Sequence, residues 1–389
     1  MAYSAALKTG IGALRRQLER WNLGRQSAQF AQHGHHEPAP DAPLLLVACS
    51  GGRDSLALAA VAHIVCAAWG LRCGAVLVDH QLQEGSHEVS WHAAEQCREL
   101  GLDPVVVVPV TVTASGQGEE ADARASRYGA FVETAQQYDA SAILLAHTAN
   151  DQAESVLIDL IRAAGTDALA GMPDHTSVDG VLFLRPWLMD VTREQTTAMC
   201  QDLGLHWWDD PTNGDHIAPQ EPLPAAYPLR SRVRHTLMPE FNRFAGRDMV
   251  SRLVAATRIA RRDVEYLNAQ AASLYDEAVH MALPTPAAPG DDGARDDECV
   301  ETLAELDVDA LREAPEALRF RVLDQALANC DIPHGSAQIE AIDQLICAWH
   351  GQRPVRVAKH YSALRWPHVI RLCKDKGHAN RRRAGHHRP

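Results

Sequence analysis

The sequence lacks any run of about 18 apolar residues, the length that a membrane-spanning helix requires. Its N-terminus also lacks the short apolar segment and cleavage site of a secretory leader. We therefore expect a soluble, cytoplasmic protein with no membrane partner. At 389 residues the chain exceeds what one hydrophobic core usually organises, so two domains are expected.

Cysteine is sparse and never paired at short spacing. The nine cysteines are scattered singly, and none forms a Cys-x-x-Cys motif. This pattern excludes a zinc ribbon and is too thin for a disulfide scaffold. The sequence therefore predicts reduced thiols.

A candidate phosphate-binding loop is the most informative feature that is present. The apolar run Leu44–Cys49 leads into a short polar loop before a helix-like segment, and the loop reads Ser50-Gly51-Gly52-Arg53-Asp54-Ser55. Glycines let consecutive N–H groups converge on an anion at the start of a helix, and Asp54 can hold a magnesium ion. The loop lacks the Walker lysine, so we expect ATP to bind here and to be cleaved differently. The alternative is a structural turn.

Strands and helices alternate through the first half of the chain. Apolar runs at 44–49, 73–79, 104–108 and 141–147 are followed by helical patterns that begin near 55, 88, 120 and 151. The runs are almost continuously apolar, which is typical of parallel strands covered on both faces. The pattern predicts an α/β fold with a doubly wound parallel sheet.

Polar residues follow three of these predicted strands. Ser50 follows the first, Asp79-His80 closes the second and His147 closes the fourth. Because the carboxyl ends of parallel strands share one edge of the sheet, these residues should meet in one crevice. The Asp79-His80 pair is either a nucleotide contact or a turn.

Two acidic residues follow His147 at helical spacing. His147, Asp151 and Glu154 share one face if a helix begins near His147. Carboxylates beside a phosphate loop can bind magnesium or deprotonate a nucleophile, whereas the alternative is capping of the helix. Arg124, one turn into the preceding helix, can neutralise phosphate or simply pair with Glu120.

The charge is distributed unevenly. The formal net charge is −13, yet nine arginines stand between residues 228 and 262 against only Glu240 and Asp248. Such a basic segment favours a polyanionic partner, and helix packing is the alternative.

The motifs resemble, in residue types and in order, those of the tRNA(Ile)-lysidine synthase family of PP-loop ATP pyrophosphatases. The resemblance covers about residues 44–245 and rests on the loop together with Val76–His80, Glu120–Tyr128, Ala146–Ser155, Arg185-Pro186-Trp187-Leu188, Asp210–Asn213 and Arg230–His235. Family members often carry His-His and Asp-Asp where Thr148 follows His147 and Asn150 precedes Asp151. The chain is similar to the short form of the family, which has no further C-terminal domain.

The resemblance implies an ATP-dependent carbon–nitrogen ligase. It would adenylate ring carbon 2 of the wobble cytidine in the CAU anticodon of tRNA(Ile), and L-lysine would then displace AMP to form lysidine. ATP and Mg²⁺ are the implied cofactors. The implied site comprises ATP-binding Ser50, Gly51, Gly52, Arg53, Asp54, Ser55, Asp79 and His80, catalytic Asp54, Arg124, His147, Asp151 and Glu154, metal-binding Asp54 and Asp151, and tRNA-binding Arg185, Arg230, Arg232 and Arg234.

Four segments are expected on this basis. An N-terminal helix with a flexible His/Pro-rich insertion (1–43) precedes an adenine nucleotide alpha hydrolase-like catalytic domain (44–228). A mostly helical tRNA-binding domain with a small end unit (229–373) and a basic tail (374–389) follow. The oligomeric state is left open, a homodimer included.

Two rival functions share part of this pattern. A tRNA 2-thiolating PP-loop enzyme, or another adenylating one, would have the same loop, but thiolation generally uses paired cysteines, which this chain lacks. A non-catalytic nucleotide-binding regulator would need the loop but neither the two carboxylates nor the arginine-rich segment.

Overall fold

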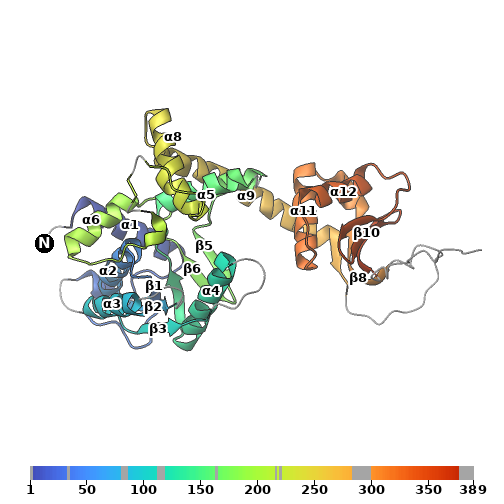
Figure 1. Ribbon diagram of the computed structural model, residues 1–389. Helices are drawn as coiled ribbons and strands as arrows, with labels where there is room; N and C mark the ends of the chain where they lie inside the picture. The colour runs from blue at the N-terminus through green and yellow to red at the C-terminus, as the bar shows by residue number, and fades with distance from the viewer. Residues whose placement is uncertain are drawn as a thin grey trace, which may run out of the picture. The chain divides into compact units, whose positions relative to one another are not determined.

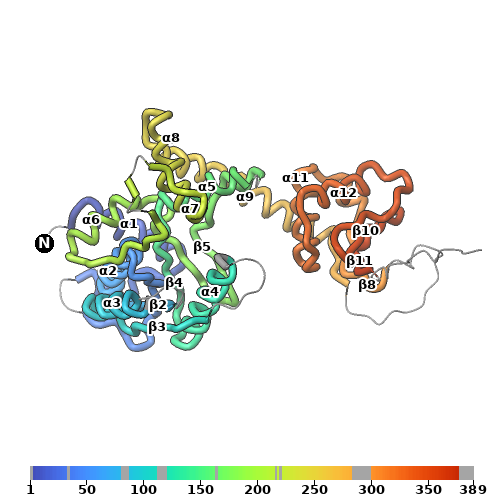
Figure 2. Tube along the Cα trace, viewed as in Figure 1, coloured from blue at the N-terminus to red at the C-terminus, as the bar shows by residue number. Residues whose placement is uncertain are grey.

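The computed structural model describes residues 3–32, 36–79, 86–111, 119–162, 165–214, 217–218, 221–282 and 299–375, with backbone only at Ser86, Glu119 and Glu120. The chain forms two compact units, Met1–Arg261 and Arg262–Pro389, and the division falls within helix α9 (Met249–Ala278). Figures 1 and 2 show the elements of each unit. Within the described ranges, no helix is long and apolar enough to cross a membrane.

Unit 1 is built on a six-stranded sheet of order β3-β2-β1-β4-β6-β5. The strands are β1 (Leu44–Ala48), β2 (Arg72–Asp79), β3 (Val105–Pro109), β4 (Ala140–Leu144), β5 (His175–Val178) and β6 (Val181–Leu184). All neighbouring strands pair in parallel except β5, which pairs antiparallel with β6. The order reverses between β1 and β4, so a crevice opens where their carboxyl ends diverge.

Helices cover both faces of this sheet because side chains alternate along β1. Leu45 and Val47 pack in one core with helices α1 (Ala5–Arg20), α2 (Arg53–Trp69), α3 (Ser86–Glu99) and α6 (Arg193–Leu203). Leu44 and Leu46 pack on the opposite face in a core that contains residues of α4 (Glu119–Gln137). The doubly wound α/β fold predicted from the sequence is thereby confirmed.

Further helices and helical turns complete unit 1. They are η1 (Ala28–Ala31), α5 (Ala149–Ile161), η2 (Gly165–Ala170), η3 (Pro211–Asn213), α7 (Leu229–Arg232), a π-helical turn η4 (Val233–Leu237) and α8 (Met238–Ala245). A small core joins Ala149 and Ala153 of α5 to Met238 of α8 and to Val250 and Val254 of α9. The arginine-rich segment through Arg261 is therefore part of unit 1, and the functional domain limits given above remain a prediction.

Unit 2 combines helices with a second sheet. The helices are α10 (Val308–Glu313), α11 (Glu316–Asn329) and α12 (Ser336–Cys347), and the strands are β7 (Val279–Met281), β8 (Cys299–Asp307), β9 (Val355–Ala358), β10 (Tyr361–Arg365) and β11 (Val369–Asp375). The sheet is antiparallel, in the order β7-β8-β11-β10-β9. Its buried side chains, such as Leu306 and Leu372, form one core with α11 and α12.

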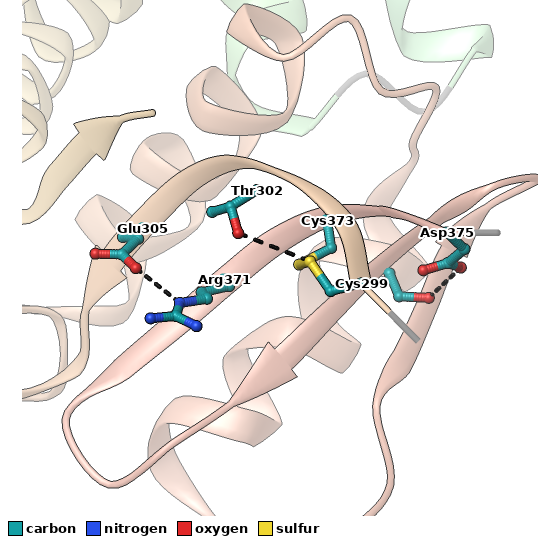
Figure 3. The surroundings of a disulfide bond; sticks show 7 residues. Cys299, Thr302, Glu305, Arg371, Cys373 and Asp375 are labelled. Atoms are coloured by element: carbon teal, nitrogen blue, oxygen red, sulfur yellow. Dashed lines mark hydrogen bonds and ion pairs between the residues drawn. A yellow bond between two sulfur atoms is a disulfide. The ribbon is translucent and has the colours of Figure 1, made fainter. Parts of the chain in front are cut away.

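A disulfide corrects the prediction of reduced thiols. Cys299 of β8 and Cys373 of β11 are bonded, with Cα atoms 5.4 Å apart, although 74 positions separate them in the sequence (Figure 3). The antiparallel pairing of β8 with β11 brings these two ends together. The same strands are linked by an ion pair in which Arg371 Nε donates to Glu305 Oε1 at 2.7 Å. The spacing of the cysteines in the sequence could not predict this bond, because only the pairing of β8 with β11 brings the two residues together.

Candidate active site

The loop after β1 has the geometry of an anion-binding turn. Gly51 has φ +77°, a region that favours glycine, and a Cβ there would lie 3.1 Å from Ala93 Cβ of α3. The Ser55 hydroxyl donates to Gly52 O at 2.9 Å and accepts from the Ser50 N–H at 3.1 Å. Among the described residues no side chain caps the N-terminus of α2 at Gly52, so the first turn of α2 presents N–H groups for an anion.

This loop forms one wall of a cavity of about 1140 Å³. The cavity is also lined by α3, by α4 and by the segment after α6. The predicted site residues that line it are Ser50, Gly51, Gly52, Arg53, Asp54, Ser55, Arg124, His147, Asp151 and Arg234. The structure thus brings together side chains that lie more than 100 residues apart in the sequence, as the shared edge of the sheet predicts.

Other predicted residues lie outside the lining. Asp79 ends β2, is 2% exposed, and has Oδ2 3.3 Å from Nδ1 of His87. Arg185 is buried and donates to Pro173 O at 3.0 Å and to the Tyr128 hydroxyl at 3.3 Å. His80 lies outside the described residues. The proposed ATP and tRNA contacts of these residues remain predictions.

The helix that follows β4 places the two acids as the spacing predicted. Thr148 is the N-cap of α5, and Asp151 accepts from its N–H at 2.8 Å and from its hydroxyl at 2.7 Å. Asp151 therefore caps the helix and also lines the cavity. Glu154 is 2% exposed and lies one turn further along α5.

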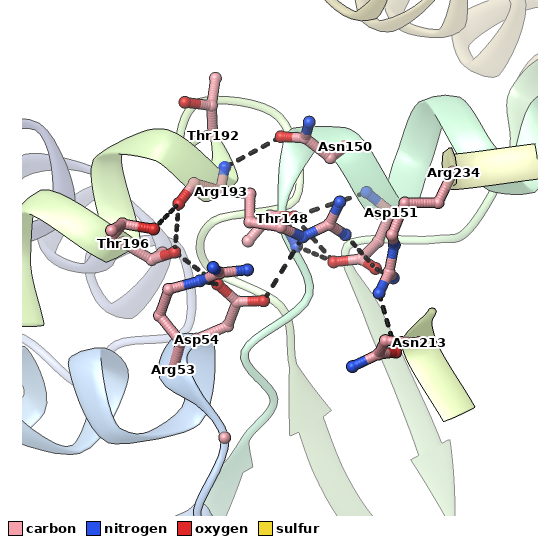
Figure 4. A network of polar contacts seen from close by, with 12 residues as sticks. Arg53, Asp54, Thr148, Asn150, Asp151, Thr192, Arg193, Thr196, Asn213 and Arg234 are labelled. Atoms are coloured by element: carbon pink, nitrogen blue, oxygen red, sulfur yellow. Dashed lines mark hydrogen bonds and ion pairs between the residues drawn. The ribbon is translucent and has the colours of Figure 1, made fainter. Parts of the chain in front are cut away.

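Three arginines surround these carboxylates and form with them the carboxylate–arginine cluster (Asp151, Glu154, Arg193, Arg230 and Arg234). Glu154 accepts from Arg234 Nε at 2.9 Å and from Arg193 Nη1 at 3.1 Å, and Arg230 Nη1 lies 3.7 Å away. Asp151 Oδ1 lies 3.3 Å from Arg193 Nη2 and 3.5 Å from Arg234 Nη2. The cluster draws on α5, α6, α7 and η4, so it ties the arginine-rich segment to α5 and α6. Figure 4 shows three of its members, Asp151, Arg193 and Arg234.

Arg193 also reaches the phosphate loop. Its Nε lies 3.9 Å from Asp54 Oδ2, and Figure 4 shows it between Asp54 and Asp151. The Thr196 hydroxyl donates to Asp54 Oδ1, and the Arg193 N–H donates to Asn150 Oδ1 at 2.9 Å. Arg193 is therefore the cation that links the loop to the acids of α5.

The electrostatics of the two cavity carboxylates differ. Burial by itself would raise the pKa of Asp151, but Arg193 foremost, with His147 and Arg234, holds that pKa well below its usual value. Burial and the charge of Asp151 raise the pKa of Asp54, which Arg193 and the Thr196 hydrogen bond only partly offset. Two acids that repel each other across a cavity favour a cation between them.

His147 and Arg124 lie at the α4 side of the cavity. Burial lowers the pKa of His147 to about 4, and its Nδ1 is buried without a hydrogen-bond partner among the described residues. The Arg124 guanidinium lies over the Tyr128 ring, 5.0 Å from the ring centre. Arg124 therefore faces the cavity as a cation, while His147 is neutral at physiological pH.

The residues predicted to bind tRNA have different surroundings. Arg230 donates to the Ser155 hydroxyl at 3.1 Å, and both it and Arg234 belong to the carboxylate–arginine cluster. Arg232 is half-buried and makes no side-chain hydrogen bond or ion pair with a described residue. With Arg185, internal contacts thus engage three of the four predicted residues, and the contacts of all four with RNA remain predictions.

Sequence reasoning missed Arg193, Thr196 and Trp208. Arg193 is the first residue of α6, directly after the N-cap Thr192, and no spacing to another motif identified it. Trp208 lines the cavity, and its backbone N–H donates to Gly51 O at 3.0 Å. The signal for Trp208 was the pair of tryptophans before the acids of the Trp207–Asn213 segment, since aromatics beside polar loops can stack on a base, although burial in a core is the commoner outcome.

The donor set suits a magnesium ion held largely by substrate. No group of three or more His, Cys, Asp or Glu side chains that could hold a metal occurs in the parts of the chain that the structure describes. Asp54 and Asp151 nevertheless line one cavity, and the negative charge of Asp151 disfavours the ionised form of Asp54. One or two carboxylates with phosphate oxygens are the usual ligands of Mg²⁺ at nucleotide sites.

Comparison with known proteins identifies the family. A family model described as a PP-loop domain matches residues 23–241, and one described as a TilS substrate binding domain matches residues 306–371. The tRNA(Ile)-lysidine synthase of Bifidobacterium animalis subsp. lactis is 54% identical over 382 residues, which cover 98% of this chain and 99% of that protein. Its counterpart in Thermobifida fusca is 39% identical over 319 residues, or 81% and 87% of the two chains. The chain therefore belongs to the tRNA(Ile)-lysidine synthase family.

Proposed function

We propose that this ATP-dependent ligase joins free L-lysine to ring carbon 2 of the wobble cytidine in the CAU anticodon of tRNA(Ile). The observation that carries the proposal is the single cavity in which an open phosphate loop faces Asp151. Such a cavity holds ATP, the cytidine and lysine within reach of one another, which two successive displacements at one carbon require. We further propose a cytoplasmic location, where these substrates are available.

The first step activates the base. The cytidine oxygen at carbon 2 attacks the α-phosphorus of ATP, the bond to pyrophosphate breaks, and adenylated tRNA forms. The N–H groups at the start of α2, with the hydroxyls of Ser50 and Ser55, support binding of the departing pyrophosphate. Arg124, a cation at the cavity wall, would stabilise negative charge on the phosphates.

The second step forms the carbon–nitrogen bond. The lysine ε-amine attacks carbon 2, AMP leaves, and the ammonium form must lose its proton before the attack. Asp151 lines the cavity and stays charged because its pKa is lowered, so it suits binding of the ammonium better than removal of its proton. Glu154 does not line the cavity and is paired with Arg193 and Arg234. We propose that its negative charge compensates the positive charge of these arginines.

Magnesium is proposed as the second cofactor. Asp54 and Asp151 would hold it, and it would supply charge neutralisation at the phosphates. Arg193 now lies between these two carboxylates and would serve as their counter-cation when no metal is bound.

Labelled lysine tests the proposed function. The protein is incubated with radiolabelled lysine, ATP, Mg²⁺ and a tRNA(Ile) transcript with a CAU anticodon, and label on the RNA is counted. Retention that requires ATP and disappears with a wobble uridine is the expected result. If intact tRNA retains no label, the assignment is wrong and tRNA thiolation or another adenylation becomes the better candidate.

A further inference from the structure

The turn between α8 and α9 presents an aromatic side chain almost entirely to solvent. Phe244, in the last turn of α8, is 88% exposed, the largest exposed fraction among the big apolar side chains in the described ranges. The next is Ile259 at 65%. A ring exposed to this extent contributes almost nothing to a core, so its face is open to a partner.

This turn is held in a defined conformation. Gly246 ends α8 with φ +62°, and the Asn242 side chain accepts from the Met249 N–H at 2.8 Å. The Asp248 carboxylate accepts from the N–H groups of Val250 and Ser251 at 3.0 and 3.2 Å. The backbone that carries Phe244 is therefore fixed in place by capping bonds.

The charges around the ring favour an anionic partner. Both acids of the segment are engaged, because Glu240 pairs with Arg243 and Asp248 caps α9. Arg247 and Arg252 are exposed and make no side-chain hydrogen bond or ion pair with any residue that the structure describes. The α8–α9 turn (residues 244–252) thus combines an exposed apolar ring with two exposed arginines that are not paired with a described side chain, against one acid, Asp248.

The turn is connected to the active site by continuous helical structure. α7, η4 and α8 follow one another without a break from Leu229 to Ala245. Arg230 and Arg234 at the start of this segment belong to the carboxylate–arginine cluster, and Phe244 stands 10 positions after Arg234. At about 1.5 Å of rise per residue, ten positions correspond to about 15 Å along the helix axis, a span that a nucleic acid whose base enters the cavity can bridge.

We propose that the α8–α9 turn is a contact for the tRNA substrate, in which the ring of Phe244 stacks on an unpaired base and Arg247 and Arg252 bind phosphates. The inference rests on the proposed function and names a recognition surface for it. Unpaired bases of RNA loops stack on exposed aromatic rings, and arginine binds the adjoining backbone. A second copy of this chain fits less well, because a two-fold contact would bring four exposed guanidinium groups together with only two carboxylates.

Binding of the full-length protein to radiolabelled CAU-anticodon tRNA(Ile) transcript tests this proposal. Phe244→Ala should weaken binding about 5- to 150-fold, the range for loss of one stacked base, and Phe244→Trp should restore it. Tyr3→Ala removes another exposed ring, 47% accessible, and should leave affinity unchanged. Across a salt series, Phe244→Ala should keep the slope, whereas Arg247→Ala with Arg252→Ala should reduce it by about 0.7 for each arginine.

Two results would overturn the inference. One is an affinity of Phe244→Ala within twofold of the Tyr3→Ala control. The other is a change in self-association, measured by light scattering, with tRNA affinity intact, which would assign the ring to contact between copies. Lysine incorporation by the unaltered protein is measured in parallel: its absence refutes the proposed function, whereas its presence with unchanged Phe244→Ala binding refutes only this surface.

Discussion

Removing the charge of Glu154 should destabilise unit 1, because its carboxylate is buried among three guanidinium groups. Glu154→Gln keeps the size of the side chain but leaves Asp151 as the one carboxylate of the cluster. Of the three arginines, only Arg193 also lies near Asp54, at 3.9 Å. Breaking a buried ion pair costs about 3–5 kcal/mol. The arginine side chains are 14%, 38% and 20% exposed, so solvent recovers part of that cost, and we expect a loss of about 2–3 kcal/mol.

Urea unfolding followed by tryptophan fluorescence measures this loss, because Trp187 is fully buried in the core of unit 1. The midpoint should fall by about 1 M. Arg234→Met should cost a similar amount, and the double variant should cost less than the sum by about 1 kcal/mol or more. Glu240→Gln, which removes an acid 59% exposed, is the control and should change stability by less than about 0.5 kcal/mol. A Glu154→Gln loss as small as the control's, or strict additivity, would refute the reasoning.

Three further changes should have measurable effects. Thr148→Ala removes the capping hydroxyl of α5 and its hydrogen bond to Asp151, so the free energy of unfolding of unit 1, measured in urea, should fall by about 1–2 kcal/mol. Thr148→Ser keeps the hydroxyl and should unfold at nearly the same urea concentration as the unaltered protein. Burial lowers the pKa of His147 to about 4, so the unfolded chain binds more protons than the folded one between about pH 6.5 and 4. The free energy of unfolding should therefore fall by up to about 3 kcal/mol as the pH drops through this window. In His147→Gln that pH dependence should be weaker. Cys299→Ser removes the disulfide that links β8 to β11 and should lower the stability of unit 2 by about 2–4 kcal/mol. Faster proteolysis within 299–375 would detect this loss, whereas Cys330→Ser, at a free cysteine, should not speed proteolysis.

The parts of the fold that the sequence predicted are those in which local pattern and packing agree. The apolar runs of β1 to β4 could only be buried strands, and the glycines after β1 required a tight turn, so both the sheet and the loop followed. The β5–β6 hairpin was missed because each strand has only four residues. The sheet of unit 2 was also missed: most of its strands are short, and the long-range pairing of β8 with β11 leaves no local pattern.

The candidate site was predictable to a similar extent. Strand ends placed Ser50, Asp54 and His147 together, and helical spacing placed Asp151 beside Glu154. Arg193 was not predictable, because a lone arginine after a helix cap has no spacing relation to the residues that it contacts. The internal pairing of Arg230 and Arg234 was equally hidden, since a basic segment gives no sign of which charges are compensated by buried acids.

Transfer of AMP from α-labelled ATP to tRNA tests the central claim most directly, because that claim places base activation at the loop that carries Asp54. Without lysine, the unaltered protein should accumulate labelled adenylated tRNA, and added lysine should release the label as AMP. Asp54→Asn should form less than about a hundredth of this product, a loss expected when one charged group at the phosphates is removed, with unchanged tRNA affinity. Adenylated tRNA formed by Asp54→Asn at the unaltered rate would contradict the account.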